Sequence, residues 1–224
     1  MARPRRISDE QILDATRAAV NQFGPGVSLE VIAGNLGFSQ PALLKRFHSR
    51  KALMVAALKP TAEPSHAASL RAGPDGRPLR EQLQEVIGWL SAYYEENAPR
   101  IAALRESGIP MCDVFPPDGG EPPPLRVKRG VAEWLQRAKR CGLVVSDFDT
   151  ETLAFSLVAT VSSRWHMRHL FAGLQPRGSE RAFLKSVTDF FVRALTPSLP
   201  RLRRPRVAAR QAPLTRPSRS SRRP

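Results

Sequence analysis

The chain has 224 residues, of which 42% are hydrophobic and 25% are charged, and its formal net charge is +15. This composition predicts a globular protein with a sizeable core. Two cysteines, Cys112 and Cys141, exclude the disulfide framework of a small secreted protein, and no C-x-x-C motif offers a zinc or redox site. No apolar run reaches the roughly 18 residues of a membrane span, and none follows the basic N-terminus as in a secretory signal. We therefore expect a soluble, cytoplasmic protein with no membrane partner.

The positive charge is concentrated at the two ends of the chain. Residues 1–60 carry nine Lys or Arg against four Asp or Glu, whereas residues 61–196 carry seventeen against sixteen. Residues 197–224 carry nine Arg and no acidic residue. Because Lys and Arg bind phosphates and release counterions, this distribution favours a nucleic acid as the partner. For the tail alone, an excess of arginine that reflects genomic base composition is an open alternative.

Two short helices are expected first. Residues 8–11, Ser-Asp-Glu-Gln, form a capping-box pattern at the start of a helix that ends at Gly24. Ser28 can cap a second helix, which ends in a tight turn at Gly37. The apolar residues expected to form the core of this region include Phe23, Ile32, Leu43 and Phe47.

Two further helices complete this region. Ser39 is placed to cap the third, and Pro41 is tolerated in its first turn, where a backbone amide has no intrahelical partner. A fourth helix is expected from about Ser49 to Leu58. Short helices joined by tight turns behind a basic arm predict a helix-turn-helix domain over residues 1–60. The second helix of such a pair fits the major groove of DNA, which is about 12 Å wide.

The remainder of the chain is expected to be all-helical. Residues 61–78 are interpreted as a linker, and residues 109–124, which are rich in proline, as a loop. The last two helices are apolar on more than one side, which suggests burial in a dimer interface. Residues 197–224 are expected to be disordered, because they offer too few apolar side chains to offset the ordering entropy. The helical segments expected between residues 79 and 196 are 79–97, 99–107, 125–141, 150–171 and 179–195.

Residues 37–53, Gly-Phe-Ser-Gln-Pro-Ala-Leu-Leu-Lys-Arg-Phe-His-Ser-Arg-Lys-Ala-Leu, resemble a pattern of the TetR family of bacterial transcriptional regulators. That pattern is roughly G-V-S-x-x-T-L-Y-x-H-F-x-S-K-x-x-L. The upstream spacing from Ala15 to Ala33 is also similar to that of the family. The resemblance implies an all-α fold with an N-terminal helix-turn-helix DNA-binding domain and a C-terminal helical domain for ligand binding and dimerisation.

The resemblance also implies which residues contact DNA. Gln40, at the start of the third helix, is the best candidate for a base-edge contact, for example with an adenine. Ala42 and Leu44 replace the common Thr and Tyr of the family, which removes two hydroxyl donors, and Leu44 could contact a thymine methyl instead. The DNA-binding residues predicted from the basic arm and the resemblance are Arg3, Arg5, Arg6, Ser28, Ser39, Gln40, Pro41, Leu44, Lys45, Arg46 and Arg50.

In the family, the C-terminal helices enclose a small-molecule pocket and form the dimer. Aromatic residues on the middle helices are the candidates here, because apolar walls with few polar groups make such pockets. Core packing is the alternative for each of them. The nearly neutral charge of residues 61–196 suggests an effector that is neither strongly anionic nor strongly cationic. The candidate ligand-binding residues are Trp89, Tyr93, Tyr94, Trp134, Phe155 and Trp165.

Other chemistry has weaker support in the sequence. His166 and His169 have a spacing that could place both imidazoles on one metal, but no third ligand is evident, and solvated histidines are the simpler interpretation. A redox switch at Cys112 would have only Cys141 as a partner. The sequence places no nucleophile beside a base, no paired carboxylates and no glycine-rich phosphate loop where catalysis would need them. We therefore expect the protein to have no enzymatic activity and to bind no metal or cofactor.

The sequence therefore predicts a ligand-responsive repressor. It would bind a palindromic operator in double-stranded DNA as a homodimer, formed through residues 150–171 and 179–195, and a small-molecule effector of unknown identity would release it. Two alternatives remain open. One is a non-specific architectural nucleic-acid-binding protein that relies on the basic tail, and the other is a helical module that binds protein rather than DNA.

Overall fold

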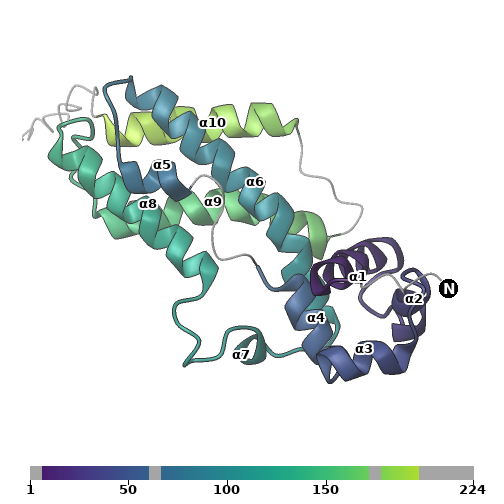
Figure 1. Ribbon diagram of the computed structural model, residues 1–224. Coiled ribbons are helices and arrows are strands. Elements are labelled where there is room, and N and C mark those ends of the chain that lie inside the picture. The colour runs from purple at the N-terminus through teal and green to yellow at the C-terminus, as the bar shows by residue number, and fades with distance from the viewer. Residues whose placement is uncertain (1–6, 61–66, 172–177, 197–224) are drawn as a thin grey trace, which may run out of the picture.

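The computed structural model describes residues 7–60, 67–171 and 178–196, and within these ranges every regular element is a helix (Figure 1). The predicted all-α class is confirmed. Arg3, Arg5, Arg6 and residues 197–224 lie outside the described residues. None of the described helices is long and apolar enough to cross a membrane. The helices are α1 Asp9–Phe23, α2 Leu29–Gly34, α3 Gln40–Phe47, α4 Arg50–Leu58, α5 Ala67–Ala72, α6 Leu79–Glu106, α7 Met111–Val114, α8 Pro123–Arg140, α9 Thr150–Leu170 and α10 Glu180–Leu195.

Serine residues begin the four N-terminal helices, as the sequence predicts. Before α1, Ser8 Oγ accepts a hydrogen bond from the amide of Gln11 at 3.2 Å, and Gln11 Oε1 accepts one from the amide of Ser8 at 2.8 Å. This is the reciprocal capping box. Ser28 and Ser49 each accept a bond from the amide three residues on. Ser39 stands at the N-cap of α3, but its side chain makes no capping hydrogen bond.

The first four helices enclose their own core. Ile12, Ile32, Leu43 and Met54, one from each helix, are each no more than 1% exposed. Phe23 does not join them, because it is the last residue of α1 and 54% of its surface is exposed. Its assignment to the core was wrong: the buried stripe of α1 extends only as far as Val20, one turn earlier, and Phe23 lies outside the N-terminal cluster.

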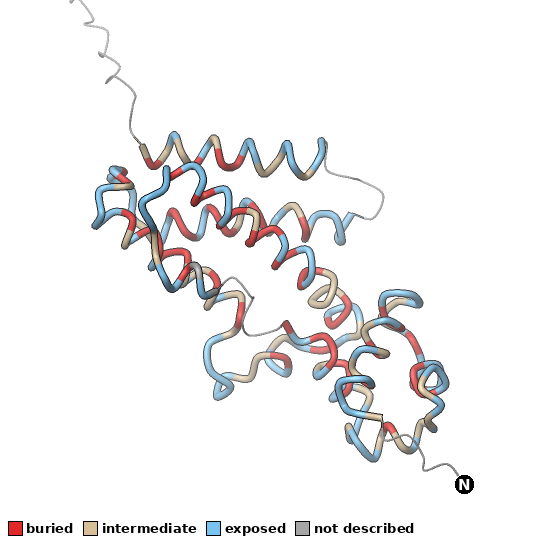
Figure 2. Tube along the Cα trace, turned by 45° about the horizontal axis from the view of Figure 1, so that its top comes forward, coloured by how far each residue is buried: buried red, intermediate tan, exposed pale blue. Residues whose placement is uncertain are grey.

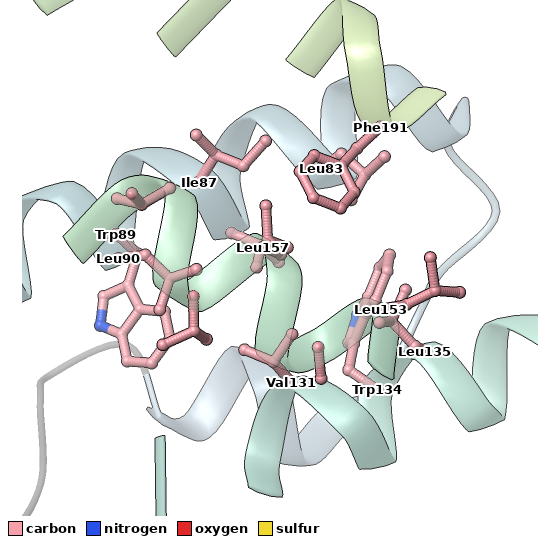
Figure 3. Close-up of a cluster of buried hydrophobic side chains, with 14 of the residues drawn as sticks. Leu83, Ile87, Trp89, Leu90, Val131, Trp134, Leu135, Leu153, Leu157 and Phe191 are labelled. Atoms are coloured by element: carbon pink, nitrogen blue, oxygen red, sulfur yellow. The ribbon is translucent and has the colours of Figure 1, made fainter. Parts of the chain in front are cut away.

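A second core lies between the long C-terminal helices. α6 packs against α9 and α10, and α8 packs against α9. Figure 2 shows the buried positions along the inner sides of these helices, and Figure 3 shows the cluster that includes Leu83, Ile87 and Leu157. α5 covers part of α8. Residues from most of the C-terminal helices therefore share one hydrophobic cluster.

α6 is one continuous helix of 28 residues that contains Pro99 in its interior. The sequence predicts a break at this point, because proline removes one helical hydrogen bond and costs about 3 kcal/mol relative to alanine. Tertiary packing overrides that preference. Ala98 and Leu104, on either side of the proline, belong to the two different cores, so both parts of the helix are held by buried contacts.

Two short helices lie in segments that the sequence predicts to be irregular. α5 lies in the expected linker, and Leu70 from it is buried in the C-terminal core, where its carbonyl accepts a hydrogen bond from Arg137. α7 lies in the expected loop, and Val114 from it is buried in the N-terminal core. Helices of four to six residues are too short to show a periodic pattern in the sequence. Each of these two is instead held in place by a buried side chain.

The two parts of the protein are joined at the end of α6 and at α7. Ala103 and Leu104 complete the core of the first four helices. Lys51 Nζ on α4 lies 2.6 Å from a carboxylate oxygen of Asp113 on α7. The hydroxyl of Ser107 donates to the carbonyl of Pro25 at 3.4 Å. The end of α6 and the segment that follows it are therefore in direct contact with the N-terminal helices.

Replacement of Pro99 by alanine restores a backbone amide to the interior of α6. We expect Pro99→Ala to raise the free energy of unfolding by roughly 1–3 kcal/mol. Urea denaturation followed by circular dichroism measures the change. Glu95→Ala, on an exposed position of the same helix, is the control and should change stability by less than about 0.5 kcal/mol. A variant less stable than wild type would contradict the interpretation that packing holds α6 straight against the local cost of proline.

Candidate nucleic-acid interface and ligand cavity

α2 and α3 form the helix-turn-helix pair. Gly37, in the turn between them, has a φ of 65°, a left-handed conformation that glycine adopts without strain. Leu43, only 1% exposed, anchors the inner side of α3 in the core. Because Leu43 fixes the rotation of α3, the opposite side of the helix faces solvent.

The predicted DNA-contacting residues of α3 lie at different depths. Pro41 and Lys45 are exposed, and Gln40 is partly exposed at the first position of the helix. Leu44 is partly buried and packs against the N-terminal core, so only part of its side chain is available for a thymine methyl. No ion pair is formed by Lys45 with any part of the chain that the structure describes. The outward side of α3 thus presents one amide and one ammonium group.

The two serines that are predicted to contact DNA differ in their hydrogen-bond partners. Ser28 caps α2 and also hydrogen-bonds Glu30. A hydrogen bond from the backbone amide of Glu30, and then this bond from Ser28, lower the pKa of the glutamate. Ser39 makes no capping bond, and its residue is exposed. The hydroxyl of Ser39 is therefore the one that is ready to donate to a phosphate.

Arg46 is part of a contact between α3 and the start of α1. Its Nη2 lies 2.7 Å from a carboxylate oxygen of Asp9, and its Nη1 donates to the carbonyl of Ile7 at 2.6 Å. Both partners lie on or just before α1. Arg46 therefore holds the segment that follows the basic arm against α3.

Arg50 braces the turn between α1 and α2. Its Nη2 donates to the carbonyl of Pro25 at 2.5 Å and to that of Val27 at 3.3 Å. The sequence resemblance implies a phosphate contact for this residue, whereas its guanidinium here satisfies carbonyls of the turn. Charge alone did not reveal this second use, because hydrogen bonds to the backbone leave no pattern in the sequence.

A cavity of about 620 Å³ lies between α5, the turn that follows it, α6 and α8. It brings together Trp89 and Trp134, two of the six residues predicted to bind a ligand. Three more are buried elsewhere: Tyr93, Tyr94 and Trp165 lie in the C-terminal core. The residues that line the cavity are Leu70, Ala72, Gly73, Pro74, Asp75, Arg77, Gln82, Glu85, Val86, Gly88, Trp89, Ala92 and Trp134.

Phe155, the sixth residue predicted to bind a ligand, does not line this cavity. It is 64% exposed on α9. Phe190 on α10 is similarly exposed, at 66%. The pattern of an apolar helix cannot distinguish a side chain that faces a cavity from one that faces outward, because both are apolar positions with the same helical spacing.

Polar residues that the sequence did not indicate form the rim of the cavity. Arg77 lies 2.8 Å from a carboxylate oxygen of Asp75 and 2.5 Å from one of Glu85. These hydrogen bonds lower the pKa of both carboxyl groups. Gln82 donates to the carbonyls of Asp75 and Arg77, at 3.1 and 2.6 Å. The turn is thereby held on α6, although the sequence predicts it as part of a linker.

The remaining candidates for metal or redox chemistry stand apart. His166 Nδ1 lies 2.9 Å from the carbonyl of Ser162. Burial and the charge of Arg168 lower the pKa of His169. Cys112 and Cys141 are both exposed free thiols. In the described ranges, no group of three or more His, Cys, Asp or Glu side chains could hold a metal ion.

The different contacts of Arg50 and Lys45 predict different effects of their substitution on the free energy of unfolding. Because Arg50 donates to two carbonyls, we expect Arg50→Met to lower the free energy of unfolding by about 1–3 kcal/mol. Lys45→Met, which removes an exposed cation from α3, should change it by less than about 0.5 kcal/mol. Urea denaturation of both variants gives the comparison. Equal losses for the two would show that Arg50 has no bracing role.

Comparisons with known proteins were made with the sequence and with the fold. No protein-family model and no curated protein matches the sequence. A TetR/AcrR-family transcriptional regulator from Thermobifida fusca has a similar structure, with a TM-score of 0.58, 16% identity, and coverage of 84% of this chain and 98% of the other.

Two further solved structures have a fold similar to that of this chain. PfmR, a TetR-family regulator from Thermus thermophilus, has a TM-score of 0.57 and 16% identity, over 83% of this chain and 99% of its own. SmeT, the repressor of the Stenotrophomonas maltophilia multidrug efflux pump SmeDEF, has a TM-score of 0.54 and 19% identity, over 84% of this chain and 90% of its own. The chain therefore has the fold of the TetR-family transcriptional regulators.

Proposed function

We propose that this protein is a ligand-responsive transcriptional regulator, and most simply a repressor. It binds a palindromic operator as a homodimer and is released by a small molecule held among the C-terminal helices. The observation that carries this proposal is the surface of α3, a helix anchored by buried Leu43: Gln40 is partly exposed at its first position, and Pro41 and Lys45 are exposed. This arrangement stands in a fold that solved transcriptional regulators share.

The position of Gln40 suits base reading. In helix-turn-helix proteins, the first residues of the second helix contact base edges in the major groove. A carboxamide can form two hydrogen bonds with the N6 and N7 atoms of adenine. Lys45, one turn further along α3, and the hydroxyl of Ser39 can contact phosphates and fix the orientation of the helix. Gln40 would then supply sequence preference, and the other two would supply affinity.

Dimerisation through α9 and α10 gives the two reading helices their spacing. Phe155 and Phe190 are large apolar side chains exposed on these neighbouring helices, and their burial between two copies would be favourable. A two-fold dimer places its half-sites about 34–36 Å apart, one turn of DNA. The palindrome of the operator would follow from this symmetry.

α6 offers a route by which a ligand could release DNA. Six residues of α6 between Gln82 and Ala92 line the cavity, and Ala103 and Leu104 of the same helix complete the N-terminal core. A ligand can shift the equilibrium only if it binds the non-operator arrangement more tightly. A displacement of α6 that accommodates the ligand would alter the positions of the two reading helices.

The proposal is tested by binding of the purified protein to fragments of its own genome at near-physiological salt, followed by footprinting. A few short palindromic footprints are expected. Even coating of all fragments, with a steep dependence on salt, would instead support the architectural alternative, in which the nine arginines of residues 197–224 dominate. Deletion of that segment should lower non-specific affinity and leave sequence preference intact.

Substitution of Gln40 tests the reading helix. Gln40→Ala should relax preference at one base pair of each half-site and weaken binding to the correct site by about 1–3 kcal/mol. Competition binding against operators substituted at single positions measures both effects. Gln84→Ala, which changes an exposed glutamine on α6, is the matched control. A uniform loss over all sequences would mean that Gln40 contacts the phosphate backbone and not a base.

Charged substitutions test the dimer. Phe155→Glu and Phe190→Glu should convert a dimer to monomers, because each would bury a carboxylate in the interface. Analytical ultracentrifugation at micromolar concentration measures the mass. Leu125→Glu, at an apolar residue of α8 that is 51% exposed, should leave the dimer intact. Dimers in all three variants would exclude α9 and α10 as the interface.

A further inference from the structure

We propose that the cavity between α5, α6 and α8 binds an uncharged, ring-containing molecule. This inference rests on the proposed function, because it specifies the class of effector. Binding to the cavity can nevertheless be tested without DNA. The volume of about 620 Å³ lies within the range of roughly 300–1,000 Å³ that is typical of small-molecule sites.

The walls of the cavity favour a flat apolar ligand. Trp89 and Trp134 contribute two indole rings from α6 and α8, and Leu70 and Val86 add aliphatic surface. Gly88 leaves open space, because a Cβ atom placed there would meet nothing within 4 Å. Aromatic side chains stack on flat rings and bury large apolar areas. The interior is therefore suited to a molecule that contains a ring system.

One polar atom in this lining lacks a partner. The indole nitrogen of Trp89 is buried and makes no hydrogen bond, although the residue is only 7% exposed. In Figure 3 it lies on the edge of the ring that faces away from the labelled leucines. By contrast, the indole nitrogen of Trp165 donates to Ser91 at 3.1 Å. Because the Trp89 nitrogen is closed off from solvent as well as unpaired, it does not face the open volume, and Trp89 offers the cavity ring surface and not a donor.

The charges around the cavity disfavour an ionic ligand. Arg77 is the lining's single cation, and its guanidinium is already paired with Asp75 and Glu85. Arg137 packs against Gly73, and its Nη2 donates to the carbonyl of Leu70. An anion would therefore lose hydration and meet a net negative lining, and a cation would compete with Arg77 for both carboxylates. A neutral molecule avoids both costs.

The test uses prodan, an uncharged naphthalene that carries a ketone, whose fluorescence changes on transfer from water to an apolar site. We expect saturable binding of prodan by the full-length protein. Trp89→Phe should weaken this binding about 2- to 5-fold, because the smaller phenyl ring offers less stacking area to the naphthalene. Gly88→Leu should abolish it by filling the cavity, and leucine suits a helix interior better than glycine. Glu95→Leu, on an exposed position of α6, is the control and should bind as wild type does.

A charged probe of similar size completes the design. The naphthalene sulfonate ANS, which is anionic, should bind more weakly than prodan. Equal prodan affinities for wild type, Trp89→Phe and Gly88→Leu would overturn the proposal, and so would tighter binding of ANS or no binding of prodan. Circular dichroism of each variant confirms that it is folded. The titration contains no DNA, so its failure is distinct from a failure to find an operator, which would overturn the proposed function.

Discussion

The structure depends most on the burial of α6 in both hydrophobic cores. One end of this helix builds the C-terminal core and the wall of the cavity, and the other end completes the core of the first four helices through Ala103 and Leu104. Neither contact is local in sequence, and together they hold the helix continuous through Pro99. A helix of 28 residues spans about 42 Å, so this one helix joins the wall of the cavity to the core of the N-terminal helices.

Basic residues of the N-terminal helices serve the fold as well as the candidate interface. Arg46 is paired with Asp9, and Arg50 donates to carbonyls of the α1–α2 turn. Both guanidinium groups therefore position the helices, while Lys45 on α3 remains directed to solvent. α3 itself is held by Arg46 and by the buried side chain of Leu43. Under the proposed function, this pre-organisation of α3 lowers the entropy lost on binding DNA.

Apolar residues of the C-terminal helices have three different environments in the structure, although they look alike in the sequence. Leu83 and Leu157 are core, Trp89 and Trp134 line the cavity, and Phe155 is exposed. All of these lie at helical spacing on apolar positions. Their roles differ only in what lies opposite: a packed side chain, an empty volume, or solvent that a second copy could displace. The partner of each face is set by the crossing of helices distant in the chain.

The sequence by itself determined the helical class, the helix starts at Ser8, Ser28 and Ser49, and the resemblance of the first helices to TetR-family regulators, because capping and tight turns are local chemistry. Tertiary structure alone decided the continuity of α6 through Pro99, the helices inside the expected linker and loop, and the exposure of Phe23. It also decided that Arg50 braces a turn and that Arg77 closes the rim of a cavity. These features arise from contacts between residues far apart along the chain, which no local pattern encodes.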